Sequence, residues 1–366
     1  MKKLPYWSHL DLLRFIAVFM VMASHFVHNK LNLFYYAHLG TYGVDIFFTI
    51  SGFLITYILL NQKERQVSTY LTFKGFYIKR FLRLFPLYYL LLVLTILCEL
   101  LYKFDVNVTR YWLWYFLYAS NFLYVYFDQH SKFFMDPTWS LAVEEQFYIF
   151  WPCILILIKS KRQVLYFTIA MILISFLSFV IFDLTNFQGR YKFLPFLNFH
   201  TLGAGALLAY VMYYHEHLLK KYFYKRIELL LFFFIIIFLF VLFKNEYSNS
   251  LYITLIREII LLFLTILCTL YAVWNFKDNK FITKYLSNKV TIYLGKISYG
   301  LYLLHYPITY IFDYYIKNEQ INFWSFLQIH PLVHLTIYFM ISIFGAYILW
   351  NLVEKPILGL KKYYNY

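Results

Sequence analysis

Ten apolar stretches, each about as long as a membrane-crossing helix, run through this chain of 366 residues. A bilayer core needs about 20 apolar residues per helix, and lipid offers no partners to an open backbone, so such stretches are predicted to be helices. The predicted spans are residues 9–28, 42–61, 84–102, 140–158, 164–182, 196–214, 227–243, 255–274, 293–314 and 332–352. We therefore predict an all-α polytopic membrane protein whose residues 1–366 form a single domain.

The distribution of charge predicts how these helices are oriented. Hydrophobic residues make up 62% of the chain and charged residues only 14%, against about 25% in soluble domains. A net charge of +15 would by itself suit nucleic acid, but Lys and Arg gather in alternate loops. With the N-terminus in the cytoplasm, internal loops and tails hold 22 of them and external ones 8. This bias predicts ten spans with both termini cytoplasmic, and no nucleic-acid partner.

Little is predicted beyond these spans. Residues 110–127 are aromatic and apolar but contain Asn121, and we expect an interfacial or re-entrant element there, because an eleventh span would reverse every later loop. The first span is followed by no cleavage site and is expected to be retained. Cys98, Cys153 and Cys268 lie in apolar runs at unrelated spacings, which predicts neither a disulfide nor a metal site.

Ionisable residues inside the spans are the main candidates for function, since a charge in lipid costs several kcal/mol unless it pairs or faces a cavity. Arg14 and His25 lie in the first span, eleven residues apart. Eleven residues turn about 1100° and rise about 16 Å, so the two side chains share one helix face. Arg14 is placed near the cytoplasm and His25 in the outer half. The alternatives are a snorkelling arginine and a packing histidine.

Acidic residues are predicted at a depth similar to that of His25. Asp45 opens the second span and could orient the imidazole, stabilise its charged form, or simply complement the helix dipole. Glu144 and Glu145 open the fourth span, which also enters from outside. One of them is expected to face the interior, and the sequence does not tell which.

Two further spans carry small and polar residues on one face. Ser298, Tyr302 and His305 follow a four-then-three spacing on the ninth span and predict a polar stripe. His305 falls in the outer half, with a packing role as the alternative. On the second span, Ser51 and Gly52 are small enough to allow close helix approach.

A basic segment lies on the cytoplasmic side of the third span. Arg80 and Arg83 are three residues apart and share a helical face, with Lys79 beside them. Guanidinium groups bind phosphate through two parallel hydrogen bonds, which suits the pyrophosphate and 3′-phosphate of coenzyme A. Anchoring to anionic lipid is the alternative. An acid/base cluster outside and an anion-binding cluster inside together suit a cytoplasmic anionic donor and an external acceptor.

These segments resemble the acyltransferase-3 family of bacterial membrane O-acyltransferases over nearly the whole chain. Arg14 and His25, with ten residues between them, look like the family's Arg-x10-His signature, although Leu12 replaces a glycine just before it. The other matching segments are residues 43–54, residues 79–86 with Lys79 for an arginine, residues 139–148 with Ala142 for a serine, residues 298–307, and Glu354-x-Pro356. Their order along the chain and their placement on spans make the combination specific.

The resemblance implies transfer of an acyl group, usually acetyl from acetyl-CoA, to a hydroxyl of a surface or exported saccharide at the bacterial inner membrane. The family's chemistry implies no metal. His25 would be the general base or a transient acyl carrier, oriented by Asp45 or Glu145. Glu144 and His305 join the catalytic candidates. The residues expected to bind the donor are Arg14, Lys79, Arg80, Arg83 and Ser51.

Some members of the family carry a fused extracytoplasmic hydrolase-like domain that completes the transfer. This chain ends at Tyr366, shortly after the last predicted span, so we expect it to act alone or with a separate glycan-assembly partner. Its oligomeric state, the acceptor glycan and the choice between acetyl and succinyl are left open. The alternative function is an exporter of a glycan or lipid-linked saccharide that performs no chemistry, since buried polar residues also suit a transport path.

Overall fold

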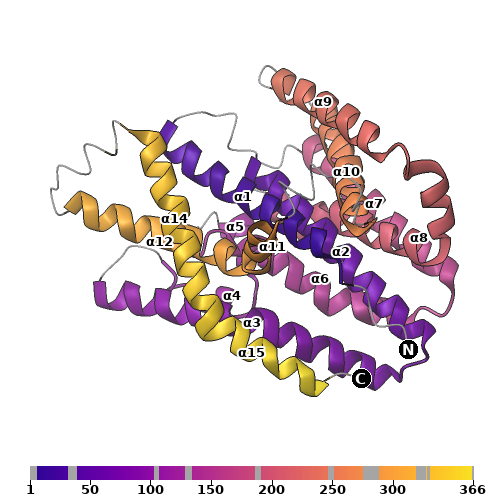
Figure 1. Ribbon diagram of the computed structural model, residues 1–366, viewed down its shortest axis with the longest axis horizontal. Coiled ribbons are helices and arrows are strands. Elements are labelled where there is room, and N and C mark those ends of the chain that lie inside the picture. Colours follow the sequence, from indigo (N-terminus) through magenta and orange to yellow (C-terminus); the bar gives the residue numbers. More distant parts are fainter. Residues whose placement is uncertain are drawn as a thin grey trace. The chain divides into compact units, whose positions relative to one another are not determined.

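The computed structural model describes residues 6–31, 39–102, 107–127, 134–185, 191–245, 251–274, 288–318, 327 and 330–364. Over these ranges the chain is helical and contains no strand, which confirms the predicted all-α class (Figure 1). The helices are α1 Ser8–Leu31, α2 Leu39–Glu64, α3 Thr69–Tyr102, α4 Trp112–Phe116, α5 Ser120–Phe127, α6 Thr138–Leu157, α7 Lys161–Leu184, η2 Tyr191–Phe193, η3 Pro195–Asn198, α8 Phe199–Phe223, α9 Ile227–Asn245, α10 Leu251–Trp274, α11 Lys289–Lys296, α12 Ser298–Asn318, α14 Pro331–Leu349, η5 Trp350–Glu354, α15 Lys355–Gly359 and η6 Leu360–Tyr364.

Each of the ten predicted spans falls on a helix or on two consecutive helical elements, the latter at 196–214, 293–314 and 332–352. In the described part of the chain, seven are long and apolar enough to cross a bilayer, and α9 offers a shorter apolar run. The total of ten spans therefore stays a prediction. The segment 110–127 forms α4 and α5, of five and eight residues. At 1.5 Å per residue neither helix covers a core of about 30 Å, as expected for an element that does not span.

Two units can be distinguished by their internal contacts. Unit 1 comprises Met1–Leu13, Asp45–Thr69 and Val143–Ile292, and unit 2 comprises Arg14–Val44, Tyr70–Ala142 and Tyr293–Tyr366. The boundaries fall inside α1, α2, α6 and α11 and after the first residue of α3, so the chain passes between the units within helices. The predicted single domain depends on how the units are placed and stays a prediction.

In unit 1, α2 and α8 pack through glycines. A Cβ atom added to Gly52 would lie 2.0 Å from the carbonyl oxygen of Leu202, and one added to Gly205 would lie 2.0 Å from that of Thr49. These distances leave no room for a side chain, so the two backbones touch directly. The structure thus confirms the close helix approach predicted at Gly52.

In unit 2, α12 and α14 pack against each other, and the end of α14 is distorted. Its last turn continues as the π-helix Trp350–Glu354. Single π turns inside helices occur frequently at functional sites. This one places the buried Glu354 so close to α12 that a Cβ atom on Gly300 would lie 3.0 Å from its Oε1.

Candidate active site

Two histidines that the sequence places independently in the outer half meet in unit 2. His25 Nδ1, from α1, lies 2.7 Å from His305 Nε2, from α12. The two rings are nearly parallel, with centroids 5.0 Å apart and an interplanar angle of 2°. His305 is fully buried, whereas His25 is partly exposed. The pair therefore combines a shielded histidine with one that a substrate can reach.

Hydrogen bonds assign the protons of this pair when both rings are neutral. His305 Nδ1 lies 2.7 Å from the carbonyl oxygen of Tyr302, which can only accept. Nδ1 therefore carries the hydrogen, and His305 Nε2 is the acceptor. His25 must then donate from Nδ1, which leaves Nε2 as its basic nitrogen. An imidazole held in this tautomer by a neighbour is suited to general base catalysis.

The wall around the histidine pair comes from α12 and from the start of α6. The Tyr306 ring packs against His25, with centroids 4.5 Å apart. Tyr302 donates its hydroxyl hydrogen to the Pro137 carbonyl oxygen at 2.9 Å and lies 2.5 Å from Ser140 Oγ. These contacts fasten the N-terminal turn of α6 beside His305. The polar stripe predicted on the ninth span is therefore real at Tyr302 and His305.

A second set of predicted residues meets in unit 1. Ser51 Oγ and the Tyr148 hydroxyl each hydrogen-bond to Glu144 Oε1, and the two hydroxyls lie 3.0 Å apart. Glu145 is buried, whereas Glu144 is partly exposed. Ser51 was expected to bind the donor or to pack, and its bond to Glu144 adds a role that the sequence did not indicate. Which glutamate faces substrate stays open.

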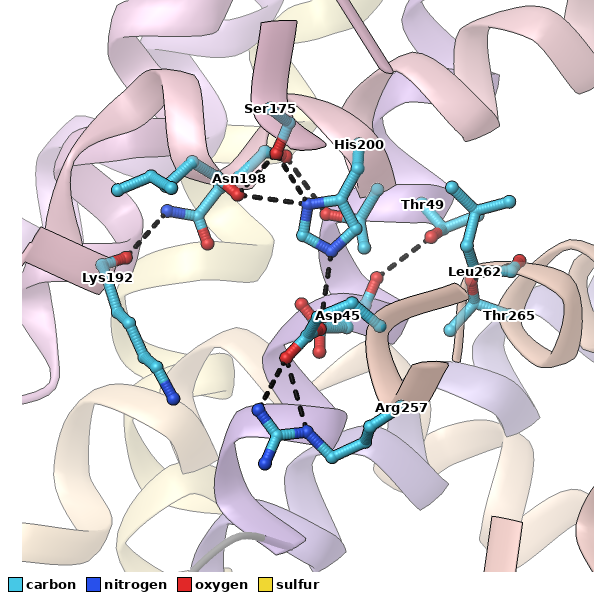
Figure 2. A network of polar contacts seen from close by, with 12 residues as sticks. Asp45, Thr49, Ser175, Lys192, Asn198, His200, Arg257, Leu262 and Thr265 are labelled. Atoms are coloured by element: carbon cyan, nitrogen blue, oxygen red, sulfur yellow. Dashed lines mark hydrogen bonds and ion pairs between the residues drawn. The ribbon is translucent and has the colours of Figure 1, made fainter. Parts of the chain in front are cut away.

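Unit 1 also holds a group of charged side chains that we call the outer ionic cluster: Asp45, Lys192, His200, Arg257 and Glu258. All of them are buried except Lys192, which is exposed, and Figure 2 labels all of them except Glu258. They come from α2, η2, α8 and α10, at ends that the predicted topology places outside. Arg257 donates from Nη2 and Nε to Glu258 Oε1 at 2.8 and 3.3 Å. Asp45 is 4% exposed and lies within electrostatic reach of the other four.

His200 is oriented by the loop before α8. Its Nδ1 lies 2.9 Å from both the Leu197 carbonyl oxygen and Ser175 Oγ, while Ser175 donates to the same carbonyl at 2.7 Å (Figure 2). Nδ1 therefore carries a hydrogen. Nε2 faces Glu258 Oε2 at 3.6 Å. A ring lone pair and a carboxylate would repel there, so His200 or Glu258 holds a further proton.

Lys192 is the member of the outer ionic cluster that lies in the connection between α7 and α8. This residue lies in η2, outside the predicted spans, where desolvation and the positive charge of Arg257 lower the pKa of its ammonium. Burying so many ionisable groups among apolar helices costs several kcal/mol each unless they are paired. The outer ionic cluster is therefore a second candidate for function.

Sequence reasoning found only part of this cluster. Asp45 was predicted as a site residue, but His200, Arg257 and Glu258 were not. The available signal was the adjacent Arg257 and Glu258 pair within an apolar run. The predicted orientation of His25 by Asp45 or Glu145 joins residues of different units, and it stays a prediction.

The residues predicted to bind the donor lie in unit 2, except for Ser51, which lies in unit 1. Lys79, Arg80 and Arg83 are on α3, and the charges of all three act on the half-buried Lys361 of η6. Their charges lie close together, with the buried Glu354 within electrostatic reach of Arg83, and a group with a net positive charge attracts anions. Arg14 is partly buried on α1. Whether these groups bind a donor stays a prediction.

Within the described ranges, no three His, Cys, Asp or Glu side chains gather as metal ligands would. The three cysteines are free thiols.

Comparison with known proteins identifies the family of this chain. The acyltransferase domain family, Acyl_transf_3, matches residues 7–351. The chain belongs to this acyltransferase family. Together with its several long apolar helices, membership supports a multi-pass membrane protein. No solved structure matches the chain.

Named relatives of this acyltransferase family member are O-acetyltransferases. It is 31% identical over 343 residues to the peptidoglycan O-acetyltransferase OatA of Listeria monocytogenes, covering 88% of this chain and 53% of the relative. A putative O-acetyltransferase of Staphylococcus aureus strain MSSA476 is 31% identical over 337 residues, which cover 87% of this chain and 53% of the relative. The putative peptidoglycan O-acetyltransferase YrhL of Bacillus subtilis is 28% identical over 369 residues, which cover 96% of this chain and 55% of the relative. The chain thus spans about half the length of these relatives.

Proposed function

We propose that this protein is a membrane O-acyltransferase that moves an acyl group, acetyl from acetyl-CoA in the simplest case, to a hydroxyl of a saccharide outside the cell. The observation that carries the proposal is the His25–His305 pair. Its hydrogen bonds hold His25 in the tautomer that a general base needs, in a chain that belongs to an acyltransferase family.

In the proposed reaction, His25 Nε2 takes the proton of the acceptor hydroxyl as the oxygen attacks the thioester carbonyl. The carbon–sulfur bond breaks, and the leaving thiolate receives the proton from His25. His305 does not exchange a proton but fixes the ring of His25 and stabilises its charged form. The alternative, in which His25 itself carries the acyl group, uses the same nitrogen as nucleophile.

The donor enters from the cytoplasmic side in this proposal. Arg80 and Arg83, supported by Lys79 and Lys361, bind phosphates of coenzyme A. The pantetheine arm is long enough to carry the thioester towards mid-membrane along the face that Arg14 shares with His25. The net positive charge of this group supports an anionic ligand for it.

The acceptor is proposed to be a cell-wall polymer. Two relatives are named for peptidoglycan, and this makes peptidoglycan our first choice over lipopolysaccharide or an exopolysaccharide. The outer ionic cluster is also compatible with the alternative function, glycan export without chemistry, because buried charges suit a transport path for a glycan. A transporter of that kind is commonly built from internal repeats, and the motifs of the two halves of this sequence differ.

The proposal is tested with purified full-length protein in lipid nanodiscs. Acetyl-CoA hydrolysis and acetyl transfer to a soluble peptidoglycan fragment are followed for the native protein, His25→Ala and His217→Ala. His217 is an exposed histidine of α8 and serves as the matched control. The proposal expects loss of both reactions in His25→Ala alone, with an unchanged elution profile. An exporter without chemistry should show neither reaction in any of the three.

A further inference from the structure

A pocket of about 820 Å³ lies in unit 1, where α1 begins and α8 and α10 end. Pockets of about 300 to 1,000 Å³ are typical of small-molecule sites. Its wall combines aromatic rings with lysines, and all its lining residues belong to the same unit. The predicted topology places this end of the helices in the cytoplasm. The pocket is therefore on the side from which an acyl donor arrives.

A distortion in α8 gives this pocket its shape. His215 leaves helical geometry, with φ −135° and ψ 32°, although hydrogen bonding continues on both sides. The two turns that follow are redirected, and they carry Lys220 and Lys221 into the pocket wall. Lys225 joins them from the turn between α8 and α9. Three lysines from one short segment thus line the same pocket.

Two aromatic pairs form the apolar part of the wall. Trp7 and Tyr57 meet edge to face, with centroids 5.1 Å apart and planes at 80°. Tyr224 and Trp274 do the same, at 5.6 Å and 63°. Trp7 and Tyr57 also pack on Phe53, with centroids 5.5 and 5.8 Å apart. The Tyr224–Trp274 pair is therefore the part of the wall proposed for stacking, since flat bases stack on aromatic side chains.

The charge of the pocket is positive. Glu216 is the acidic lining residue, and it pairs with Lys220 at 2.7 Å. The charges of Lys221 and Lys225 are not balanced by another acid of the lining. Lysine ammonium groups bind phosphate as point charges. Aromatic faces beside phosphate-binding cations select a ligand that carries both a flat base and a phosphate.

We propose that this pocket binds a nucleoside phosphate, namely the 3′-phosphoadenosine end of the acyl-CoA donor. The choice of donor rests on the proposed function. An anionic lipid headgroup shares the phosphate but has no planar base, so the Tyr224–Trp274 pair favours the nucleotide.

The test measures binding of adenosine 3′,5′-bisphosphate to the full-length protein in nanodiscs of phosphatidylcholine. The pocket variants are Lys221→Gln combined with Lys225→Gln, and Trp274→Leu. We expect each to weaken binding about tenfold or more, and Lys221→Arg with Lys225→Arg to restore it. Arg162→Gln is the matched control, because Arg162 is an exposed cation of the same unit and the same predicted side. It should bind like the native protein. Thermal unfolding of each variant confirms the fold.

Three outcomes would overturn the inference. The first outcome compares the pocket variants with Arg80→Ala. If Arg80→Ala weakens nucleotide binding and the pocket variants do not, the arginines bind the nucleotide and the pocket does not. If short-chain phosphatidylglycerol displaces the nucleotide while adenosine alone does not compete, and Trp274→Leu binds normally, the pocket is a lipid site. If the native protein transfers acetyl but binds no nucleotide, the pocket proposal fails and the proposed function stands. Nucleotide binding that depends on the pocket, without any transfer, would instead refute the proposed function alone.

Discussion

Replacing His305 tests whether it acts only by holding His25. In His305→Gln, the amide oxygen can accept from His25 Nδ1 and the amide nitrogen can donate to the Tyr302 carbonyl. Both hydrogen bonds of the native ring, each 2.7 Å long, are thereby preserved. In His305→Phe, the shape is kept but both bonds are lost. We expect the Gln variant to keep at least about a tenth of the native rate.

The magnitude for the Phe variant follows from what His25 loses. Without an acceptor at His305, His25 is no longer restricted to the tautomer with a basic Nε2. A positioned general base contributes about 10² to 10⁴ in rate, and at 1.36 kcal/mol per tenfold this is about 3 to 5 kcal/mol. The Phe variant should lose most of that factor, as His25→Ala does. It also removes one of the hydrogen bonds that the Tyr302 carbonyl oxygen accepts, at a cost of about 1 kcal/mol in stability.

The assay is the initial rate of acetyl transfer in nanodiscs, normalised to folded protein by size exclusion. The order expected is native, then His305→Gln, then His305→Phe close to His25→Ala. Equal losses in the Gln and Phe variants would refute the reasoning, because His305 would then act on the substrate itself. A Phe variant with native activity would refute it as well, since His25 would not need the contact.

Three further predictions concern packing, buried charge and the donor. Gly52→Ala should lower the free energy of unfolding by about 1 to 3 kcal/mol, because its Cβ meets a backbone oxygen, whereas Gly359→Ala, with no atom within 4 Å, should change the melting temperature little. Glu258→Gln should lower the free energy of unfolding by about 3 kcal/mol, because Arg257 stays buried without its carboxylate partner. Glu216→Gln, which breaks the surface ion pair with Lys220, should lower it by under about 1 kcal/mol in the same denaturation experiment. Arg83→Ala should raise KM for acetyl-CoA with little change in kcat, and a change in kcat alone would contradict that role.

Hydrophobic pattern and the cost of charge in lipid were enough to predict the helices and one pair of site residues. Each predicted span falls on helical elements because about 20 apolar residues in lipid have no other way to satisfy their backbone. His25 and His305 were placed at the same depth by counting residues from the predicted membrane boundaries. That both lie in unit 2 and touch could not be read from depth alone.

The outer ionic cluster shows what the sequence could not supply. His200 opens α8 and Glu258 lies in α10, 58 residues further along the chain. Each looks like a terminal or packing residue when its own helix is considered alone. Their shared role depends on which faces of α2, α8 and α10 meet, and the contact of Gly52 and Gly205 with opposing backbones decides the packing of α2 on α8. The kink at His215 likewise could not be predicted from the sequence, because no proline or glycine lies beside it.

The most direct test of the central claim is mass spectrometry of surface glycans from cells with and without this gene, complemented by the native protein or by His25→Ala. The account predicts an acyl mass increment on a glycan that appears with the native protein and is absent with His25→Ala at equal membrane levels. An unchanged glycan mass, accompanied by a fall in the amount of a surface glycan, would contradict it and favour export without chemistry.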